Sequence, residues 1–314
     1  MALVTDGFTT YASVGNREHL SDMIHNISPT DTPFLSSIEK IKTTSTKHEW
    51  QTDALAAASG TNAVLEGDEA TTDAAVATVR RYNYTQISDK VAAVTGTEQV
   101  INKAGRKDQM AYEMAKRAKE LKRDVETTLF GNVASVAGNA TTARKIAGME
   151  AWIATNDDFG ASGASPTGDG TDTRTDGTQR AFTETQVKNA LNLAWTEGGN
   201  PDTIYVGGFN KQVMSGFSGN ATRVIGAGEK ALQASIDVYK SDFGDIKVVA
   251  SRFSRSRSAL IVDSSMWKFA TLRDFQVEDL ARSGDYVRKQ LLVEYTLEAS
   301  NQKASAGVFD LTTS

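Results

Sequence analysis

A long amphipathic helix over residues 105–130 is the feature that most limits how this chain can fold. About 25 residues at a rise of ~1.5 Å make a rod of roughly 37 Å. Its apolar residues recur at spacings of three and four, which indicates one continuous apolar stripe. Gly131 and Asn132 follow and predict the end of the helix. The stripe comprises Met110, Met114, Ala118, Leu121, Val125 and Leu129.

The polar face of this helix carries both signs of charge. Opposite charges four residues apart each stabilise a helix by a few tenths of a kcal/mol. Mixed signs favour a solvated, self-paired face over a DNA-reading one. The predicted pairs are Glu113 with Arg117, Lys116 with Glu120, and Lys122 with Glu126.

Composition excludes several classes of protein. The 314 residues suggest one large domain or two ordinary ones, and 39% hydrophobic with 23% charged residues is normal for a folded soluble chain. A net charge of -5 argues against a surface that coats nucleic acid. There is no cysteine, which excludes disulfides, thiolate metal sites and a cysteine nucleophile. Neither a signal peptide nor a run of about 18 apolar residues is present, so we expect a cytoplasmic protein without membrane contact.

The first 40 residues lack a sustained period, and we interpret them as an extended arm with a helical turn or two over residues 16–27. Thr32 precedes a proline and is therefore biased toward extended geometry. Phe34, Leu35 and Ile38 then offer apolar anchors. We expect this arm to dock on another surface.

Residues 41–95 indicate a long two-stranded excursion with strands over residues 46–52 and 76–87. Between them lies an Ala-rich stretch with an acidic tip at residues 66–69. An isolated two-stranded ribbon is marginal in water. The ribbon is therefore predicted to pack on another chain.

The second half of the chain alternates between loop and regular structure. Residues 157–181 are rich in Gly, Ser, Thr and Asp and indicate a mobile exposed loop. Residues 182–262 indicate an α/β segment, in which Thr183 and Gln186 match a capping box. Its predicted strands are residues 201–206, 236–240, 246–250 and 259–262, and the turn at residues 241–245 predicts that the second and third of them form a hairpin. Strands near the C-terminus are predicted at residues 268–272, 275–280, 287–297 and 307–311.

No constellation predicts catalysis, a cofactor or a metal. The spacing and neighbours of His19, His25 and His48 do not suggest a metal site or a catalytic triad. Residues 226–230 lack the glycine spacing of a phosphate loop. The spacing of Asp169, Asp172 and Asp176 does not match a calcium loop and indicates a flexible acidic one.

Arg252, Arg255 and Arg257 form a basic cluster. A solvated turn, or pairing with acidic neighbours in an assembly, is favoured there over phosphate contact.

Three separated segments carry a resemblance to a known family. They read ISPTDTPFLS at residues 27–36, ELKRDVETTLFGN at residues 120–132 and RKIAGMEAWI at residues 144–153. In this order, the chain resembles the major capsid proteins of tailed bacteriophages, of a podovirus-type subfamily with the Hong Kong 97-like (Johnson) fold. The resemblance implies an α+β fold with an N-arm, an E-loop β-hairpin, a long spine helix, a P-domain sheet and an A-domain.

The resemblance also implies boundaries for these parts. They are residues 1–40 for the N-terminal arm, 41–95 for the E-loop, 96–156 for the P-domain with its spine helix, 157–181 for the flexible loop, 182–262 for the A-domain and 263–314 for the return of the P-domain sheet.

The implied function is structural and non-enzymatic. Copies would form the hexamers and pentamers of an icosahedral head that encloses double-stranded DNA, with assembly in the host bacterial cytoplasm. Gly105 is a candidate flex point during expansion of the shell. Lysines lie in or beside the ribbon, but no motif predicts covalent crosslinking. The candidate inter-subunit contacts are Phe34, Leu35, Trp50, Tyr82, Tyr84, Arg252, Arg255 and Arg257.

Further partners are implied in the same way. The arm-like sequence starts almost at Met1, so we expect a scaffolding protein to be a separate chain. A portal, a decoration protein on the loop at residues 157–181, and packaged DNA in weak non-specific contact complete the expected partners.

Three alternatives stay open at this point. An encapsulin-like nanocompartment shares the fold and predicts protein cargo. A hydrolase with an appended ribbon predicts loss of activity on mutation of a histidine or carboxylate. A DNA-binding protein predicts affinity for duplex that falls steeply with salt.

Overall fold

The computed structural model describes residues 31–70, 72–101, 108–217 and 238–314. Several predictions fall outside these residues and stay untested: the helical turns at residues 16–27, the roles of His19 and His25, the flex point at Gly105 and the phosphate-loop question at residues 226–230.

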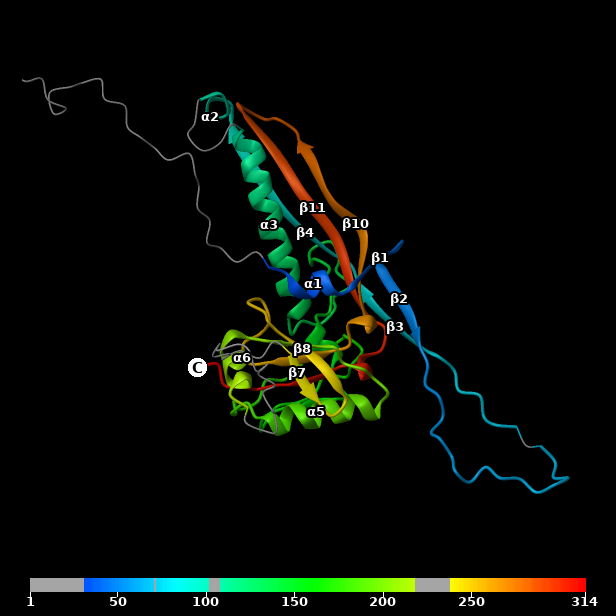
Figure 1. Ribbon diagram of the computed structural model, residues 1–314. Coiled ribbons are helices and arrows are strands. Elements are labelled where there is room, and N and C mark those ends of the chain that lie inside the picture. Colours follow the sequence, from blue (N-terminus) through cyan, green and yellow to red (C-terminus); the bar gives the residue numbers. More distant parts are fainter. Residues whose placement is uncertain (1–30, 71, 102–107, 218–237) are drawn as a thin grey trace, which may run out of the picture.

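A long four-stranded sheet forms the upper half of the molecule in Figure 1. Its order is β1-β10-β11-β4, with β1 parallel to β10 and the other neighbours antiparallel. The strands β10 and β11 each span 14 residues. The bounds are Glu39–Lys42 for β1, Gln86–Thr95 for β4, Trp267–Leu280 for β10 and Tyr286–Ala299 for β11. The strands predicted at residues 268–272 and 275–280 are thus one strand, β10, interrupted by bulges in its pairing.

Helix α3 (Gln109–Phe130) lies along this sheet, mainly against β4. Asp108 caps it by accepting the amide of Ala111 at 3.1 Å. Leu121, Val125 and Leu129 are fully buried on the sheet side, which confirms the predicted stripe. The short helix α2 (Gly96–Val100) precedes it.

The ion pairs of the helix differ from prediction at two of the three pairs. Glu120 lies 2.6 Å from Arg117, and no ion pair with Lys116 is formed. Glu113 and Arg117 lie 3.9 Å apart, as expected. The pair of Lys122 with Glu126 is wrong, because Glu126 is buried and points away from solvent. Its carboxylate instead accepts backbone amides of α1 (Pro33–Ser37).

A six-stranded sheet forms the second half, in the order β5-β12-β9-β6-β8-β7. The helices α5 (Glu184–Thr196) and α6 (Gly208–Ser215) accompany it. Thr183 and Gln186 form the predicted capping box, which is thereby confirmed. The hairpin of β7 and β8 was also predicted. The bounds are Asp157–Asp158 for β5, Thr203–Val206 for β6, Val238–Ser241 for β7, Gly244–Ala250 for β8, Ala259–Val262 for β9 and Ala306–Val308 for β12.

The range 263–314 was predicted to return to the first sheet, but only part of this C-terminal segment does so. Its last strand, β12, inserts between β5 and β9 of the second sheet. Three short helices complete this part: α4 (Met149–Trp152), η1 (Ser264–Met266) and η2 (Gln302–Ala304). A core that contains Trp152 and Trp267 continues from α3 to Tyr205 of β6, so the two halves share buried contacts.

The segment over residues 157–181, which its composition indicated as an exposed loop, is fixed to the body at several points although about half of its residues are exposed. The Arg174 side chain has no exposed surface and lies 2.7 Å from the Asp157 carboxylate. Its guanidinium also stacks on the Phe309 ring at 3.5 Å. Backbone bridges join Ala164 with Thr175 in the same segment. Buried ion pairs and hydrogen bonds hold the segment down where apolar side chains are scarce.

The two-stranded ribbon is shorter than the predicted range of 41–95. Its strands are β2 (Lys47–Thr52) and β3 (Val79–Tyr84), while β1 and β4 on either side belong to the long sheet. Between β2 and β3, the chain runs far out from the body (Figure 1).

Candidate assembly interface

The base of the ribbon is tied to the body of its own chain. Trp50 is half-buried and its ring lies 5.3 Å from that of Trp152 in the main core. His48 Nε2 lies 2.7 Å from the Glu298 carboxylate. Burial alone would raise the pKa of Glu298, but hydrogen bonds from His48 and Ser300 hold that pKa below its usual value. The ribbon therefore leaves the body in a defined direction, and Trp50 offers a neighbour only part of its surface.

Tyr82 and Tyr84 face away from the core on β3. Between them, Asn83 is buried and donates to the Leu297 carbonyl at 2.8 Å. The two tyrosine rings contact edge to face at 5.6 Å, and the Lys47 ammonium lies 4.1 Å from the Tyr82 ring. Since side chains alternate along a strand, anchoring Asn83 inward directs both tyrosines outward. They form a half-exposed aromatic patch that suits contact with another chain.

The distal part of the ribbon, residues 53–78, holds four of the five most exposed large apolar side chains among the described residues. Leu55 is 99% exposed, Val64 83%, Leu65 79% and Val76 80%. Apolar side chains in a water-exposed hairpin contribute no burial free energy to the isolated chain. They indicate a surface that is covered in an assembly.

Phe34 and Leu35 were predicted as inter-subunit contacts, but both side chains pack mainly within their own chain. Both are buried in their own chain, with Phe34 0% exposed. The Phe34 ring packs 5.2 Å from Phe130 and 5.7 Å from Tyr205. The arm segment at residues 33–37 thus completes the core of its own subunit.

Glu126 fastens this segment, and the charge pattern alone did not identify it. Its two oxygens accept the amides of Phe34 at 2.8 Å and Leu35 at 2.9 Å. Burial raises its pKa to about 7, although the two amides act in the opposite direction. The signal in the sequence was its position directly after Val125 of the apolar stripe. A carboxylate so close to the stripe is placed for burial, and an ordinary solvated carboxylate does not fit there.

The arginine cluster divides into two kinds of residue. Arg255 contacts Glu150 and Asp176, each at 2.5 Å, and Arg257 contacts Asp310 at 2.6 Å. These acidic partners belong to the same chain, so the pairing predicted with neighbours is satisfied internally. Arg252 is exposed and forms no ion pair with any described residue, which leaves it available to a partner.

Among the described residues, no group of three His, Cys, Asp or Glu side chains is placed to hold a metal ion. In the same part of the chain, no helix combines the length and apolar composition needed to cross a membrane. The acidic residues Asp169 and Asp172 accept hydrogen bonds from Thr167, so they act as local turn acceptors.

Comparison with known proteins matches this architecture to phage coat proteins. The model of the SU10 major capsid protein family matches residues 4–312. The major capsid protein of Escherichia phage Phieco32 is 25% identical over 338 aligned positions, which cover 96% of each chain.

Solved structures agree on the fold. A chain of the Cyanophage A-1(L) capsid asymmetric unit superposes with a TM-score of 0.68 at 15% identity, covering 98% of this chain and 99% of that one. A chain from Gordonia phage Cozz gives a TM-score of 0.64 at 11% identity, covering 100% and 99%. The chain therefore belongs to the SU10 major capsid protein family of tailed phages and has the Hong Kong 97-like fold.

Proposed function

We propose that copies of this chain form the hexamers and pentamers of an icosahedral phage head around double-stranded DNA. The observation that carries the proposal is the ribbon over residues 53–78, which projects from the body with its apolar side chains exposed. Such a ribbon is stable only when another surface covers it. A shell of overlapping copies supplies that surface at every subunit.

In this proposal, α3 serves as the spine helix and the four-stranded sheet as the P-domain. The six-stranded sheet with α5 and α6 serves as the A-domain near the symmetry axes, and the ribbon serves as the E-loop. These assignments rest on family membership and on the arrangement in Figure 1. They amend the predicted boundaries, because β4 joins the P-domain sheet and β12 joins the A-domain sheet.

The remaining contact candidates are Trp50, Tyr82, Tyr84 and Arg252. The tyrosine pair presents rigid aromatic surface, which is enriched in interfaces. Arg252 presents an exposed cation to a neighbour's carboxylate. Arg255 and Arg257 contribute instead to the fold that presents it.

Further partners follow from the family alone. We expect a scaffolding protein and a portal during assembly in the host cytoplasm, a decoration protein on the outside of the shell, and packaged DNA in weak non-specific contact within it. An encapsulin-like compartment is the second candidate, and the phage capsid neighbours favour the first.

Electron microscopy of the expressed full chain, alone and with a co-expressed scaffold, tests the function. We expect closed shells, tubes or capsomers that contain no protein cargo. A matched variant replaces residues 54–77 with a short Gly-Ser turn. It should unfold at the same urea concentration as the full chain, because all the replaced residues that the structure describes are exposed, yet it should not assemble. A full chain that stays a monomer under all these conditions would contradict the proposal, and so would normal shells from the variant.

A further inference from the structure

The distal ribbon carries an unusual charge. Residues 53–78 contain five acidic residues and no lysine or arginine. The whole chain has 39 acidic and 34 basic residues, so the remainder holds 39 − 5 = 34 acidic residues against the same 34 basic ones. The entire net charge of -5 therefore resides in this segment. Its acidic residues are Asp53, Glu66, Asp68, Glu69 and Asp73.

The tip of the ribbon is a formed turn. The Leu65 carbonyl accepts the amide of Asp68 at 3.1 Å, and the Asp68 carboxylate accepts the amide of Glu69 at 3.0 Å. Gly67 has a φ of 86°, which the third position of a type II turn requires. The turn presents Leu65 and Glu66 side by side at the end of the excursion. The tip thus offers one apolar side chain next to a group of carboxylates.

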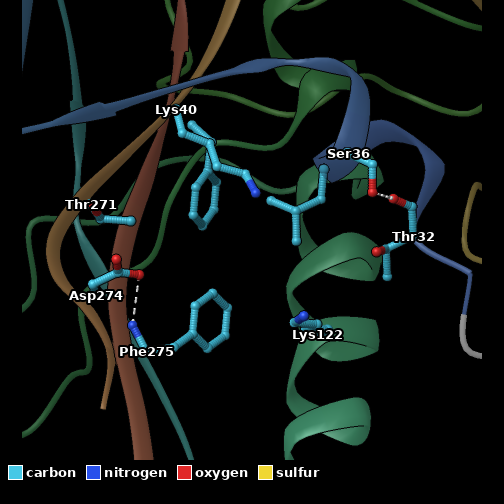
Figure 2. A pocket seen from close by; sticks show the side chains of 9 residues that line it. Thr32, Ser36, Lys40, Lys122, Thr271, Asp274 and Phe275 are labelled. Atoms are coloured by element: carbon cyan, nitrogen blue, oxygen red, sulfur yellow. Dashed lines mark hydrogen bonds between the residues drawn. The ribbon is translucent and has the colours of Figure 1, made fainter.

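A hollow of about 230 Å³ on the body has the complementary chemistry. It lies between α1, β1, α3 and β10, as Figure 2 shows. The half-buried ring of Phe275 provides most of the apolar surface, with small exposed parts of Leu35 and Phe269 beside it. Lys40 and Lys122 stand on opposite sides. Small-molecule sites occupy about 300–1,000 Å³. This hollow is smaller and suits a side chain of a partner.

Neither Lys40 nor Lys122 forms an ion pair with any residue that the structure describes. Asp274 is the acidic residue in the lining, and its carboxylate accepts the amide of Phe275 at 2.8 Å. The Ser36 hydroxyl on the rim donates to the Thr32 carbonyl. The lining therefore keeps a net positive charge that faces the opening.

We propose that this hollow receives the ribbon tip of a second copy of the chain. Leu65 would cover the aromatic surface, and the carboxylates of Glu66, Asp68 and Glu69 would pair with Lys40 and Lys122. The tip and the hollow of one subunit lie far apart in Figure 1, which makes the contact intermolecular. The inference rests on the proposed function and adds the site to which the ribbon binds. Each exposed ion pair is weak in water, but a closed shell repeats the contact at every subunit.

Carbodiimide cross-linking of assembled particles tests the contact directly. The reagent joins a carboxylate and an amine that already touch, without a spacer. Particles assembled from a mixture of ¹⁴N- and ¹⁵N-labelled full chains are cross-linked, digested and analysed by mass spectrometry. We expect mixed-isotope peptides that join Lys40 or Lys122 to Glu66, Asp68 or Glu69, and none from unassembled protein.

Charge reversal provides the matched variants. The double variant Lys40→Glu and Lys122→Glu should lower particle yield about tenfold, because like charges then face each other. The control, Lys42→Glu with Lys119→Glu, makes the same change on the same strand and helix outside the hollow, and it should assemble normally. Glu66→Lys with Glu69→Lys in the first variant should restore yield.

The outcomes separate this contact from the function itself. Normal particles in which the mixed-isotope peptides join the tip to other lysines would overturn the contact and leave the capsid function standing. Equal loss of assembly in the Lys42 and Lys119 control, without rescue by the exchanged charges, would also overturn it. Absence of any particles from the unmodified chain would overturn the proposed function and the contact together.

Discussion

The carboxylate of Glu126 accepts the backbone amide of Phe34 at 2.8 Å, in a place where the Glu126 side chain has no exposed surface. Its second oxygen accepts the amide of Leu35. Thr32, the N-cap of α1, makes no side-chain hydrogen bond to that helix. A residue of α3 therefore supplies the cap that the local sequence does not, and it fastens the arm segment to the middle of the molecule.

Replacement of Glu126 by glutamine should destabilise the fold. Glutamine keeps the size of the side chain but offers one acceptor oxygen, so a buried amide of Phe34 or Leu35 then faces a donor. A buried unsatisfied donor costs about 1–3 kcal/mol. Urea denaturation at pH 5 will measure this cost, because Glu126 is then protonated in the fold and its two oxygens can still accept. The control Glu120→Gln removes a partly exposed pair with Arg117 and should cost less than about 1 kcal/mol. Equal losses from the two variants would contradict the anchoring role.

The same carboxylate should make stability depend on pH. Burial raises the pKa of Glu126 from 4.5 to about 7, so the folded chain binds this proton more tightly than the unfolded one. Its contribution is therefore complete below pH 4.5 and is lost as the pH rises to about 7. At about 1.36 kcal/mol per pKa unit, the loss is about 3 kcal/mol.

Unfolding free energies measured from pH 4.5 to 8 check this prediction. The slope should be present in the unmodified chain and absent from Glu126→Gln, so the difference between the two curves isolates the group. Parallel curves over this interval would show that Glu126 titrates normally in the fold.

Removal of the buried Arg174 side chain should be severe. Arg174→Ala leaves the Asp157 carboxylate without its partner, and the exposed fractions of the two side chains are 0% and 7%. Breaking a buried pair costs about 3–5 kcal/mol. The neighbouring pair of Arg180 with Asp158 is 28% and 27% exposed, so Arg180→Ala should cost less than about 1 kcal/mol. Thermal unfolding of both variants compares the two losses of stability. Similar midpoints would argue against a structural role for residues 157–181.

Within the arginine cluster, replacement of Arg255 should affect the stability of the subunit, and replacement of Arg252 should affect assembly. Glu150 is fully buried; burial raises its pKa, and the charge of Arg255 partly offsets that effect. Arg255→Ala should therefore destabilise the subunit by about 3–5 kcal/mol. Arg252→Ala should change unfolding by no more than about 0.5 kcal/mol and should reduce particle yield instead. Unfolding curves combined with particle counts distinguish the two, and a stable Arg255→Ala subunit would show that its ion pairs are dispensable.

Patterns with short sequence spacing predicted their elements well. The stripe along α3, the capping box at Thr183 and the β7–β8 hairpin all depend on contacts between residues two to four apart or on a tight turn. Such contacts recur wherever the local backbone is formed. They leave a period or a paired residue type in the sequence, which is why these elements were predictable.

Patterns read from composition were less successful. Residues 157–181 have few apolar side chains, and that composition is typical of an exposed loop. The segment folds onto the body because Arg174 meets Asp157 and Phe309, whose position β12 sets. Likewise, Lys122 and Glu126 are four apart on α3, but only the helix orientation shows which of them is buried.

The sequence by itself determined the elements, their order and the family, because local periods and the three quoted segments are properties of neighbouring residues. It also indicated that the ribbon needs a partner, since its lack of a core is a matter of composition. Only the tertiary structure decided that Phe34 and Leu35 are buried in their own chain, that Glu126 caps α1, and that Lys40 and Lys122 face one hollow. Each of these depends on contact between segments far apart in the chain; Glu126 and Phe34 are 92 positions apart. Such pairs leave no mark in the spacing of residues, because the packing of α3 on the long sheet creates them.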